Sequence, residues 1–395
     1  MYSIMKQNNR ICNNFLLLSF ILAPLYNAEN IYLRYIGITF IIIIFFISIS
    51  YLFKLIAKNS TFYLSRIMIK PAVYIFFILC SFIIAITIDF RLYNFKPFIQ
   101  FILLLVYFSF LIRVDLFKIN YRKIFYAIFV IIIICYIPMI LGYGSDHMGY
   151  KGIFSTTTFL GIYSFFLLQL SFLAYKTSGK RIFILCLILS LLLMLKAQTR
   201  ASFLGLIFAI FSYILLSLKK IKVFTWKIAK YALLLGLISL IIVYPRLDEF
   251  SWYPWLSKLV YETTGKILMS GRNSIWEYAT SLIKNRILFG YGFDAFSVLN
   301  ISPHNSYLGI ALQSGIFGLI TIVLFINSLF NIMYMCRKNQ MVRICTSFFI
   351  GNLTVCAFEV MLFQGQIILS LLFWLIVAIG VKKVINVQEE EKNDI

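Results

Sequence analysis

Three basic residues of this chain, Arg200, Arg272 and His304, carry side chains that could act on a phosphate-linked substrate. A guanidinium binds phosphate oxygens through two parallel hydrogen bonds, so two arginines could clamp a pyrophosphate and neutralise the charge that builds on it as a leaving group. An imidazole titrates near neutral pH, and His304 could take a proton from an attacking hydroxyl. These residue types therefore suit the displacement of a pyrophosphate by a hydroxyl.

Each of these residues also has a simpler explanation. Arg200 follows Lys196 between two apolar stretches, where basic side chains commonly reach toward lipid headgroups. Arg272 could be a solvated charge in a loop. His304 could merely precede a helix that Asn305 or Ser302 caps. The residues alone leave these alternatives open.

Three further signals are less specific. Gly290-Tyr291-Gly292 predicts a tight turn that brings the backbone close to a neighbour. The second histidine, His147, lies in a glycine-rich stretch, and we do not expect it to be catalytic. Glu359 lies in an apolar stretch predicted to be helical, where a carboxylate is costly in lipid. It is therefore either a functional residue or a structural partner for an arginine or lysine.

The chain that positions these residues has the composition of a membrane protein. Of its 395 residues, 62% are hydrophobic and only 13% are charged. Apolar stretches near the length needed to cross a bilayer predict an all-α, polytopic membrane helix bundle of about 12 transmembrane helices. The predicted helices are 11–27, 31–53, 71–89, 97–113, 124–141, 154–175, 182–196, 201–218, 229–245, 305–335, 344–363 and 366–381.

The charge distribution predicts the orientation of this bundle. The formal net charge is +22, and 24 of the 36 lysines and arginines fall on the side that carries both termini. Because basic residues concentrate in cytoplasmic loops, the excess is a topology signal that also suits anionic lipids, and it does not indicate a nucleic-acid partner. The expected segments are transmembrane helices in 1–244, a large periplasmic loop in 245–305, transmembrane helices in 306–381 and a cytoplasmic tail in 382–395. The polar end of this tail, 387–395, is expected to be disordered.

The 245–305 loop carries most of the polar signals. A helix is predicted after Ser270-Gly271-Arg272-Asn273, because apolar residues from Ile275 onward recur at helical spacing, and Ser270 or Asn273 could cap it. The loop is also rich in tryptophan and tyrosine. These rings could lie at the level of the lipid headgroups or offer flat faces to sugar rings, and their number favours the first interpretation.

Three motifs in this part of the chain resemble those of the bacterial O-antigen polymerase and O-antigen ligase superfamily of polysaccharide-assembly enzymes. In the order typical of that family they are Gln198-Thr199-Arg200-Ala201-Ser202 at a helix junction, Ser270-Gly271-Arg272 followed by Trp276, and Gly290-Tyr291-Gly292 leading to His304-Asn305-Ser306-Tyr307-Leu308. Gly315-Ile316-Phe317-Gly318, also typical, follows them. The resemblance covers residues 185–320 in detail, and the number of helices and the large loop fit the whole chain.

The resemblance implies a GT-C-like glycosyltransferase of the bacterial inner membrane that takes a glycan from undecaprenyl pyrophosphate on the periplasmic side. By resemblance, Arg200 and Arg272 hold the pyrophosphate and His304 activates the acceptor hydroxyl. Further candidate contacts to pyrophosphate or glycan are Gly292, Asn305 and Trp276. The resemblance implies no cofactor, neither a nucleotide sugar nor an essential metal. The expected partners are membrane lipids and the chain-length regulator and flippase of the same pathway.

Two reactions share these motifs. A polymerase joins repeat-unit oligosaccharides into a longer lipid-linked chain, whereas a ligase moves the finished chain onto lipid A-core. The Ser-Gly-Arg-x-x-x-Trp form and the His-Asn-Ser-Tyr-Leu ending favour a polymerase for O-antigen or capsule, with a ligase as the alternative. A polysaccharide-lipid transporter is a more remote alternative, because transporters place ionisable residues near the bilayer midplane and here the polar signals gather at helix ends.

Overall fold

The structure is a computed structural model, and it describes residues 18, 20–57, 66–88, 95–114, 121–146, 149–218, 231–232, 235–236, 239, 242–265, 267–269, 271–293, 295–296 and 302–393. His147, Ser270 and parts of the predicted helices 11–27 and 229–245 lie outside these residues. Within them the chain is almost entirely helical, and seven helices are long and apolar enough to cross a membrane. The predicted all-α polytopic membrane bundle is confirmed.

The apolar stretches form helices because a helix satisfies every backbone hydrogen bond within its own segment, which lipid requires. The seven candidate spans lie in α2 (Ile31–Ala57), α3 (Ile69–Ile88), α5 (Tyr121–Ile140), α6 (Thr157–Ser178), α8 (Arg200–Ser217), α13 (Ser306–Met335) and α15 (Ile367–Asn393). Two apolar helices are shorter, α4 (Phe95–Leu111) and α7 (Ile182–Ala197), and α14 (Gln340–Cys356) lies between α13 and α15. Apart from α14 and α15, these helices begin and end close to the predicted positions.

The described part of the 245–305 loop is itself mostly helical. It contains the 3-10 helix η5 (Tyr244–Glu249) and the helices α10 (Tyr253–Thr264) and α11 (Arg272–Asn285). Short elements elsewhere are the 3-10 helices η1 (Ala23–Asn27) and η2 (Arg66–Met68) and the strands β1 (Ser145–Asp146) and β2 (Gly149–Tyr150), which form an antiparallel hairpin. The helix predicted after Gly271 is therefore confirmed as α11.

The helix predicted at 344–363 is too long. α14 ends at Cys356, and residues 357–366 follow without helical structure, so Glu359 lies in a loop and not inside a helix. Gly365 allows the chain to turn back within this loop. Its φ of 79° is left-handed, and its α-carbon packs so closely that a Cβ would lie 2.5 Å from the Val360 carbonyl oxygen. The neighbouring Gln366 N–H donates to the same carbonyl, which closes the loop.

The expectation that the end of the 382–395 tail is disordered is wrong for residues 387–393. α15 continues without a break through Asn393. The tail is rich in lysine, glutamate and glutamine, which are good helix formers, and it extends a helix that is already nucleated in the apolar stretch. Its first turn also retains buried apolar residues at Val381 and Val384.

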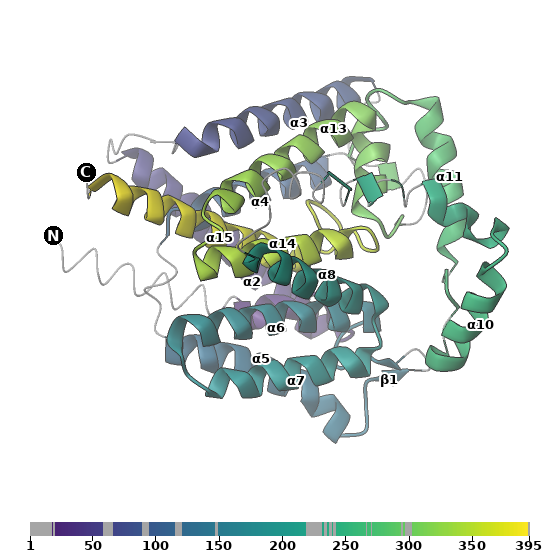
Figure 1. Cartoon of the computed structure of the whole chain (residues 1–395), viewed down its shortest axis with the longest axis horizontal. Coiled ribbons are helices and arrows are strands. Elements are labelled where there is room, and N and C mark those ends of the chain that lie inside the picture. Colours follow the sequence, from purple (N-terminus) through teal and green to yellow (C-terminus); the bar gives the residue numbers. More distant parts are fainter. Residues whose placement is uncertain are drawn as a thin grey trace. The chain divides into compact units, whose positions relative to one another are not determined.

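The helices gather into two compact units. The first comprises Met1–Tyr63, Leu103–Leu206 and Ile368–Asn386, and the second comprises Leu64–Ile102, Ile207–Ile367 and Val387–Ile395. In the first unit α6 packs along α7, and α5 lies against both (Figure 1). A left-handed Gly179, with φ of 66°, ends α6 and allows the short turn into α7.

The second unit is built around α13. Helix α3 packs along α13, and α11 and α14 also contact it (Figure 1). Small residues permit this close packing, because a Cβ on Gly318 of α13 would lie 3.3 Å from the Ser81 hydroxyl of α3. Next to this contact, the rings of Phe82 and Phe293 stack with their centroids 3.8 Å apart.

Candidate active site

His304 and Glu359 form a polar pair in the second unit, although 55 residues separate them in sequence. His304 Nδ1 lies 3.2 Å from Glu359 Oε1 and 3.4 Å from Oε2. The imidazole side chain is 41% exposed, whereas the carboxyl side chain is only 7% exposed. A carboxylate that accepts the Nδ1–H of a neutral imidazole leaves Nε2 as the proton acceptor. The imidazole is therefore accessible while its carboxylate partner stays buried.

The backbone around His304 is held on both sides. His304 itself has a left-handed φ of 46°, which is uncommon for a residue other than glycine. Before it, Trp276 Nε1 donates a 2.7 Å hydrogen bond to the Pro303 carbonyl. After it, Asn305 Oδ1 accepts from Leu308 N at 3.0 Å and caps α13, as the sequence predicted. Such a cap stabilises a helix by about 1 kcal/mol.

Glu359 is fixed by the first residue of α13. The Ser306 hydroxyl donates to the Glu359 carbonyl at 2.8 Å and accepts from Met361 N at 3.1 Å. The Glu359 carboxylate also accepts from Val360 N at 3.3 Å. The sequence had suggested an arginine or lysine as the structural partner of this carboxylate. The partner in the structure is His304.

The order of the helices brings the pair together. His304 lies two residues before the start of α13, and Glu359 lies three residues after the end of α14. Since α14 returns from the end of α13, the start of one helix and the end of the other lie at the same end of the helix pair. The residues between His304 and Glu359 form the two successive helices α13 and α14, which run in opposite directions and so bring the two side chains together.

Arg272 and Trp276 lie one turn apart on α11. A spacing of four residues places both side chains on the same face of a helix. Trp276 is fully buried, its ring lies 4.4 Å from that of Tyr244, and its indole N–H anchors the segment before His304. Arg272 is half-buried, and no described residue forms an ion pair with it. The Ser-Gly-Arg-x-x-x-Trp motif therefore places Arg272 on α11, the same helix whose Trp276 holds the segment before His304.

The cap of α11 differs from the prediction. Gly271 occupies the cap position with a left-handed φ of 71°, and no side chain caps the helix. Asn273 lies inside α11, so its predicted capping role is wrong, and Ser270 lies outside the described residues. The glycine lets the chain turn sharply into the helix immediately before Arg272.

The glycines of Gly290-Tyr291-Gly292 hold a break in α13. Gly315 has φ of 65° and ψ of −167°, which interrupts the helical backbone. The interruption leaves the Leu312 and Gln313 carbonyls to accept from Tyr291 N and Gly292 N, both at 2.8 Å. In return, Ile316 N and Phe317 N donate to the Ile287 and Leu288 carbonyls. The predicted tight turn is confirmed, and the neighbour that it approaches is α13.

Close backbone contact explains why this exchange requires glycine. A Cβ on Gly290 would lie 2.4 Å from the Leu312 carbonyl oxygen, and a Cβ on Gly315 would lie 2.2 Å from the Leu288 carbonyl oxygen. Both residues also have left-handed φ angles. The two glycine motifs recognised in the sequence, 290–292 and 315–318, are therefore the two halves of one contact.

Arg200 belongs to the first unit. It is the half-buried first residue of α8 and follows a junction in which Gln198 has a left-handed φ of 52°. The Thr199 hydroxyl donates to the Thr157 carbonyl of α6 at 3.1 Å, and Gly161 packs directly against Thr199. The Gln-Thr-Arg motif thus forms a fixed corner between α7 and α8, as predicted.

The β1–β2 hairpin packs against the end of α7, next to this corner. Gly149 approaches the end of α7 so closely that a Cβ would lie 3.2 Å from the carbonyl oxygens of Lys196 and Ala197. The Tyr150 hydroxyl donates to the Cys135 carbonyl of α5. Burial raises the pKa of Tyr150 to about 12, so the phenol remains a neutral donor at physiological pH.

Two other predicted contacts have structural roles. Gly292 uses its N–H to bond the Gln313 carbonyl, and Trp276 offers no exposed ring face because it is fully buried. A contact of either residue with pyrophosphate or glycan stays a prediction. The roles that the motifs predict for His304, Arg272 and Arg200 stay predictions, and the pairing of His304 with Glu359 was not predicted.

Comparison with known proteins agrees with the motifs. Residues 184–323 match the family model described as O-Antigen ligase. The matched segment contains Arg200, Arg272 and His304, and it ends before Glu359. No curated protein matches the chain. Residues 184–323 of this multi-pass membrane protein are therefore similar to the O-Antigen ligase family, which confirms the resemblance of the motifs to the O-antigen ligase and polymerase superfamily.

Proposed function

We propose that this chain is a polymerase that joins undecaprenyl-pyrophosphate-linked repeat units on the periplasmic face of the bacterial inner membrane. The observation that carries the proposal is the His304–Glu359 pair, in which an accessible imidazole is oriented by a buried carboxylate. A base of this kind suits the activation of a sugar hydroxyl. The family match supports a polymerase- or ligase-type reaction on a lipid-linked glycan.

The proposed reaction is a single displacement at the anomeric carbon of the donor glycan. His304 Nε2 takes the proton of the acceptor hydroxyl as its oxygen forms the new glycosidic bond. The bond from the anomeric carbon to the pyrophosphate breaks, and undecaprenyl pyrophosphate leaves with the bonding electrons. Glu359 stabilises the imidazolium that forms, because its carboxylate accepts the Nδ1–H hydrogen bond.

The arginines would act on the leaving group. Arg272 is supported here by its place on α11, which Trp276 ties to the segment before His304. We assign Arg200 the same role from its motif and from its fixed position at the start of α8. Planar guanidinium groups can neutralise the charge that develops on pyrophosphate oxygens.

A ligase is the second candidate, and a specific observation favours it: the matching family model is described as O-Antigen ligase. The same base, leaving group and arginines serve both reactions, so the acceptor alone distinguishes them. In a polymerase the acceptor is a sugar of a second lipid-linked unit. In a ligase it is a sugar of lipid A-core.

A lipopolysaccharide gel of a deletion strain separates the two reactions. We expect a single repeat unit on core, because the ligation step is intact and polymerisation is lost. Core without glycan, together with long lipid-linked chains in the membrane, would instead assign the ligase reaction. Lipid-linked glycan of unchanged length that remains on the cytoplasmic side would favour transport and contradict both enzymatic proposals. Partnership with the flippase and the chain-length regulator of the pathway belongs to the polymerase proposal.

A further inference from the structure

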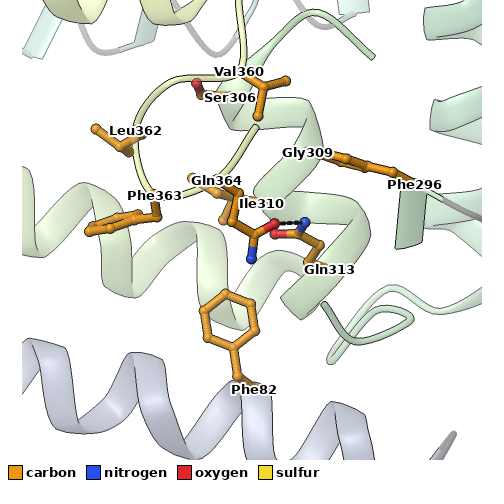
Figure 2. A pocket seen from close by; sticks show the side chains of 10 residues that line it. All are labelled: Phe82, Phe296, Ser306, Gly309, Ile310, Gln313, Val360, Leu362, Phe363 and Gln364. Carbon is orange, nitrogen blue, oxygen red and sulfur yellow. Dashed lines mark hydrogen bonds between the residues drawn. The ribbon is translucent and has the colours of Figure 1, made fainter. Parts of the chain in front are cut away.

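A narrow pocket beside the His304–Glu359 pair contains a buried amide nitrogen that has no hydrogen-bond partner among the described residues. Its lining residues are Phe82, Phe296, Ser306, Gly309, Ile310, Gln313, Val360, Leu362, Phe363 and Gln364. Figure 2 shows the amides of Gln313 and Gln364 facing each other, with Phe296 on one side and Phe363 on the other. The pocket therefore combines an apolar wall with a pair of amides.

The hydrogen bonds of the two amides fix which atom is left over. Gln313 Nε2 donates to the Phe293 carbonyl at 3.3 Å and also to Gln364 Oε1. The Phe293 carbonyl can only accept, so it orients the Gln313 amide, and that amide in turn orients Gln364. The remaining donor, Gln364 Nε2, is buried and has no hydrogen-bond partner among the described residues. A buried donor without a partner is unfavourable, and an acceptor that entered the pocket would remove this cost.

We propose that this pocket binds an acetyl group of the glycan, with its carbonyl oxygen accepting from Gln364 Nε2 and its methyl group against the phenylalanine rings. The proposal deepens the proposed function and rests on it for the identity of the glycan. It assigns the pocket as a specificity subsite for an acetylated sugar, either N-acetylated or O-acetylated, since both substituents present the same carbonyl and methyl groups.

The chemistry of the lining favours this ligand over others. A carboxylate of an acidic sugar would be buried here beside amides and a hydroxyl, with no cation among the lining residues. A prenyl chain would fill the apolar wall but offers no acceptor to Gln364. A water molecule needs two to four polar partners, and most of the lining side chains are apolar. An acetyl group matches both the single donor and the aromatic wall.

The position of the pocket connects it to the base. Ser306, which lines the pocket, donates to the Glu359 carbonyl and lies two residues after His304. Gly309 follows one turn later on α13, and a Cβ there would lie 3.0 Å from the Phe296 ring and 3.8 Å from Pro303. An acetylated sugar held in the pocket would therefore lie at the same end of α13 as the imidazole.

Binding of the repeat-unit oligosaccharide tests the proposal without requiring catalysis. The probe is the oligosaccharide released from the lipid-linked pool of the deletion strain, with its reducing end reduced. Four forms of this oligosaccharide are compared. The first is the oligosaccharide as isolated, and the second has lost its O-acetyl groups in mild alkali. The third has also lost its N-acetyl groups in strong alkali, and the fourth has been selectively N-reacetylated. Saturation-transfer NMR with the whole protein in lipid nanodiscs should show the strongest transfer at the acetyl methyl protons. Loss of the acetyl group concerned should weaken binding about tenfold, as expected for one neutral hydrogen bond and one buried methyl group.

Two variants address the pocket in different ways. Gln364→Met removes the donor, and Gly309→Ala fills the space beside Phe296 while it favours the helix. Each should lower affinity for the acetylated oligosaccharide about tenfold and leave the affinity for the deacetylated form unchanged. Gln366→Met is the matched control, because Gln366 lies two residues further along the same loop and does not line the pocket. It should bind both forms as the wild type does.

The outcomes separate this proposal from the proposed function. A repeat unit without acetyl groups, or equal binding of both forms by the wild type, would overturn the acetyl subsite and leave a buried water as the occupant. That result would not affect the polymerase proposal, which the gel of the deletion strain tests. Conversely, a deletion strain with normal polymer would overturn the polymerase, while the NMR comparison would still decide the pocket. If Gln364→Met does not fold, Gly309→Ala carries the same comparison.

Discussion

His304 is held in a conformation that its own backbone does not favour. A left-handed φ of 46° for a residue other than glycine costs on the order of 1 kcal/mol or more. The hydrogen bond from Trp276 to Pro303 and the cap formed by Asn305 maintain it. Strain of this kind is commonly stored at functional sites, where it aims a side chain that relaxed backbone would point elsewhere.

The first prediction is that His304→Ala abolishes polymer formation. Removal of a positioned base typically costs about 10²–10⁴-fold in rate, so no polymer should be detected on a gel of complemented deletion cells. The protein should still insert in the membrane, because Asn305 caps α13 independently of the imidazole. His147→Ala is the control and should retain activity. Normal polymer from His304→Ala at normal expression would show that another group accepts the proton.

A second prediction concerns the carboxylate. Glu359→Gln keeps an oxygen at the same distance from Nδ1 but replaces a charge-assisted hydrogen bond by a neutral one. The difference is about 1 to 1.5 kcal/mol, so kcat should fall about tenfold while KM for the lipid-linked substrate changes little. Steady-state transfer assays with purified protein measure both constants. An unchanged kcat would mean that Glu359 supports only the fold of its loop.

Much of the site could be predicted from the sequence, because Arg200, Arg272 and His304 stand in short motifs of fixed spacing. The spacing of Arg272 and Trp276 is a helical turn, and Asn305 is a favourable cap. The pairing of His304 with Glu359 could not be predicted, since the two residues lie on either side of two helices. The available signal was a carboxylate in an apolar stretch, which pointed to a function but not to a partner.

At the scale of elements, the broken helix α13 and the 290–292 turn depend on each other. Four backbone hydrogen bonds cross between α13 and residues 287–292, two in each direction. They replace the intrahelical bonds that Gly315 interrupts, so the break leaves these backbone groups satisfied. The part of α13 before the break, which begins with the cap next to His304, is therefore held by its own hydrogen bonds to Tyr291 and Gly292.

The third prediction follows from this contact. Gly315→Ala would place a Cβ 2.2 Å from the Leu288 carbonyl oxygen and impose a left-handed conformation on alanine. Strain and displacement together should destabilise the protein by about 2 kcal/mol or more. Thermal unfolding of the purified protein should therefore shift to lower temperature, and transfer should be lost.

Gly236→Ala is the matched control for this substitution. No described residue lies within 4 Å of the position of its Cβ, and its φ is not left-handed. Its unfolding temperature should stay within a degree or two of the wild type. Equal stability of Gly315→Ala and wild type would contradict the close backbone contact.

Helices could be predicted better than their ends. Apolar stretches gave the positions of α2 to α8 and of α13, because helix length in lipid follows the thickness of the bilayer. The end of α14 could not be read from hydropathy, since Val360, Leu362 and Phe363 continue the apolar stretch in a loop that packs within the protein. The end of α15 was misjudged for the opposite reason, because polar composition does not exclude a helix.

At the scale of the whole molecule, the fourth prediction concerns topology. Both termini should be cytoplasmic and the 245–305 loop periplasmic, because the lysine and arginine excess lies on the side of the termini. An alkaline phosphatase fusion after Gly265 should be active, and fluorescent protein fused after Gln388 should be folded and bright.

A fusion after Asn339, between α13 and α14, is the internal control. It should behave as cytoplasmic, because α13 leads from the periplasmic loop to the other side. Active phosphatase after Gln388 or after Asn339 would contradict the predicted orientation. Inactive phosphatase after Gly265 would contradict the periplasmic position of α10 and α11.

The separation of His304 and Glu359 along the chain has a consequence for biosynthesis. During translation the histidine leaves the ribosome first, and its carboxylate follows only after α13 and α14 have been synthesised. A nascent chain inserted up to α13 thus presents an imidazole without the group that orients it. The competent centre forms when α14 has joined α13, at a stage when most of the bundle is already in the membrane.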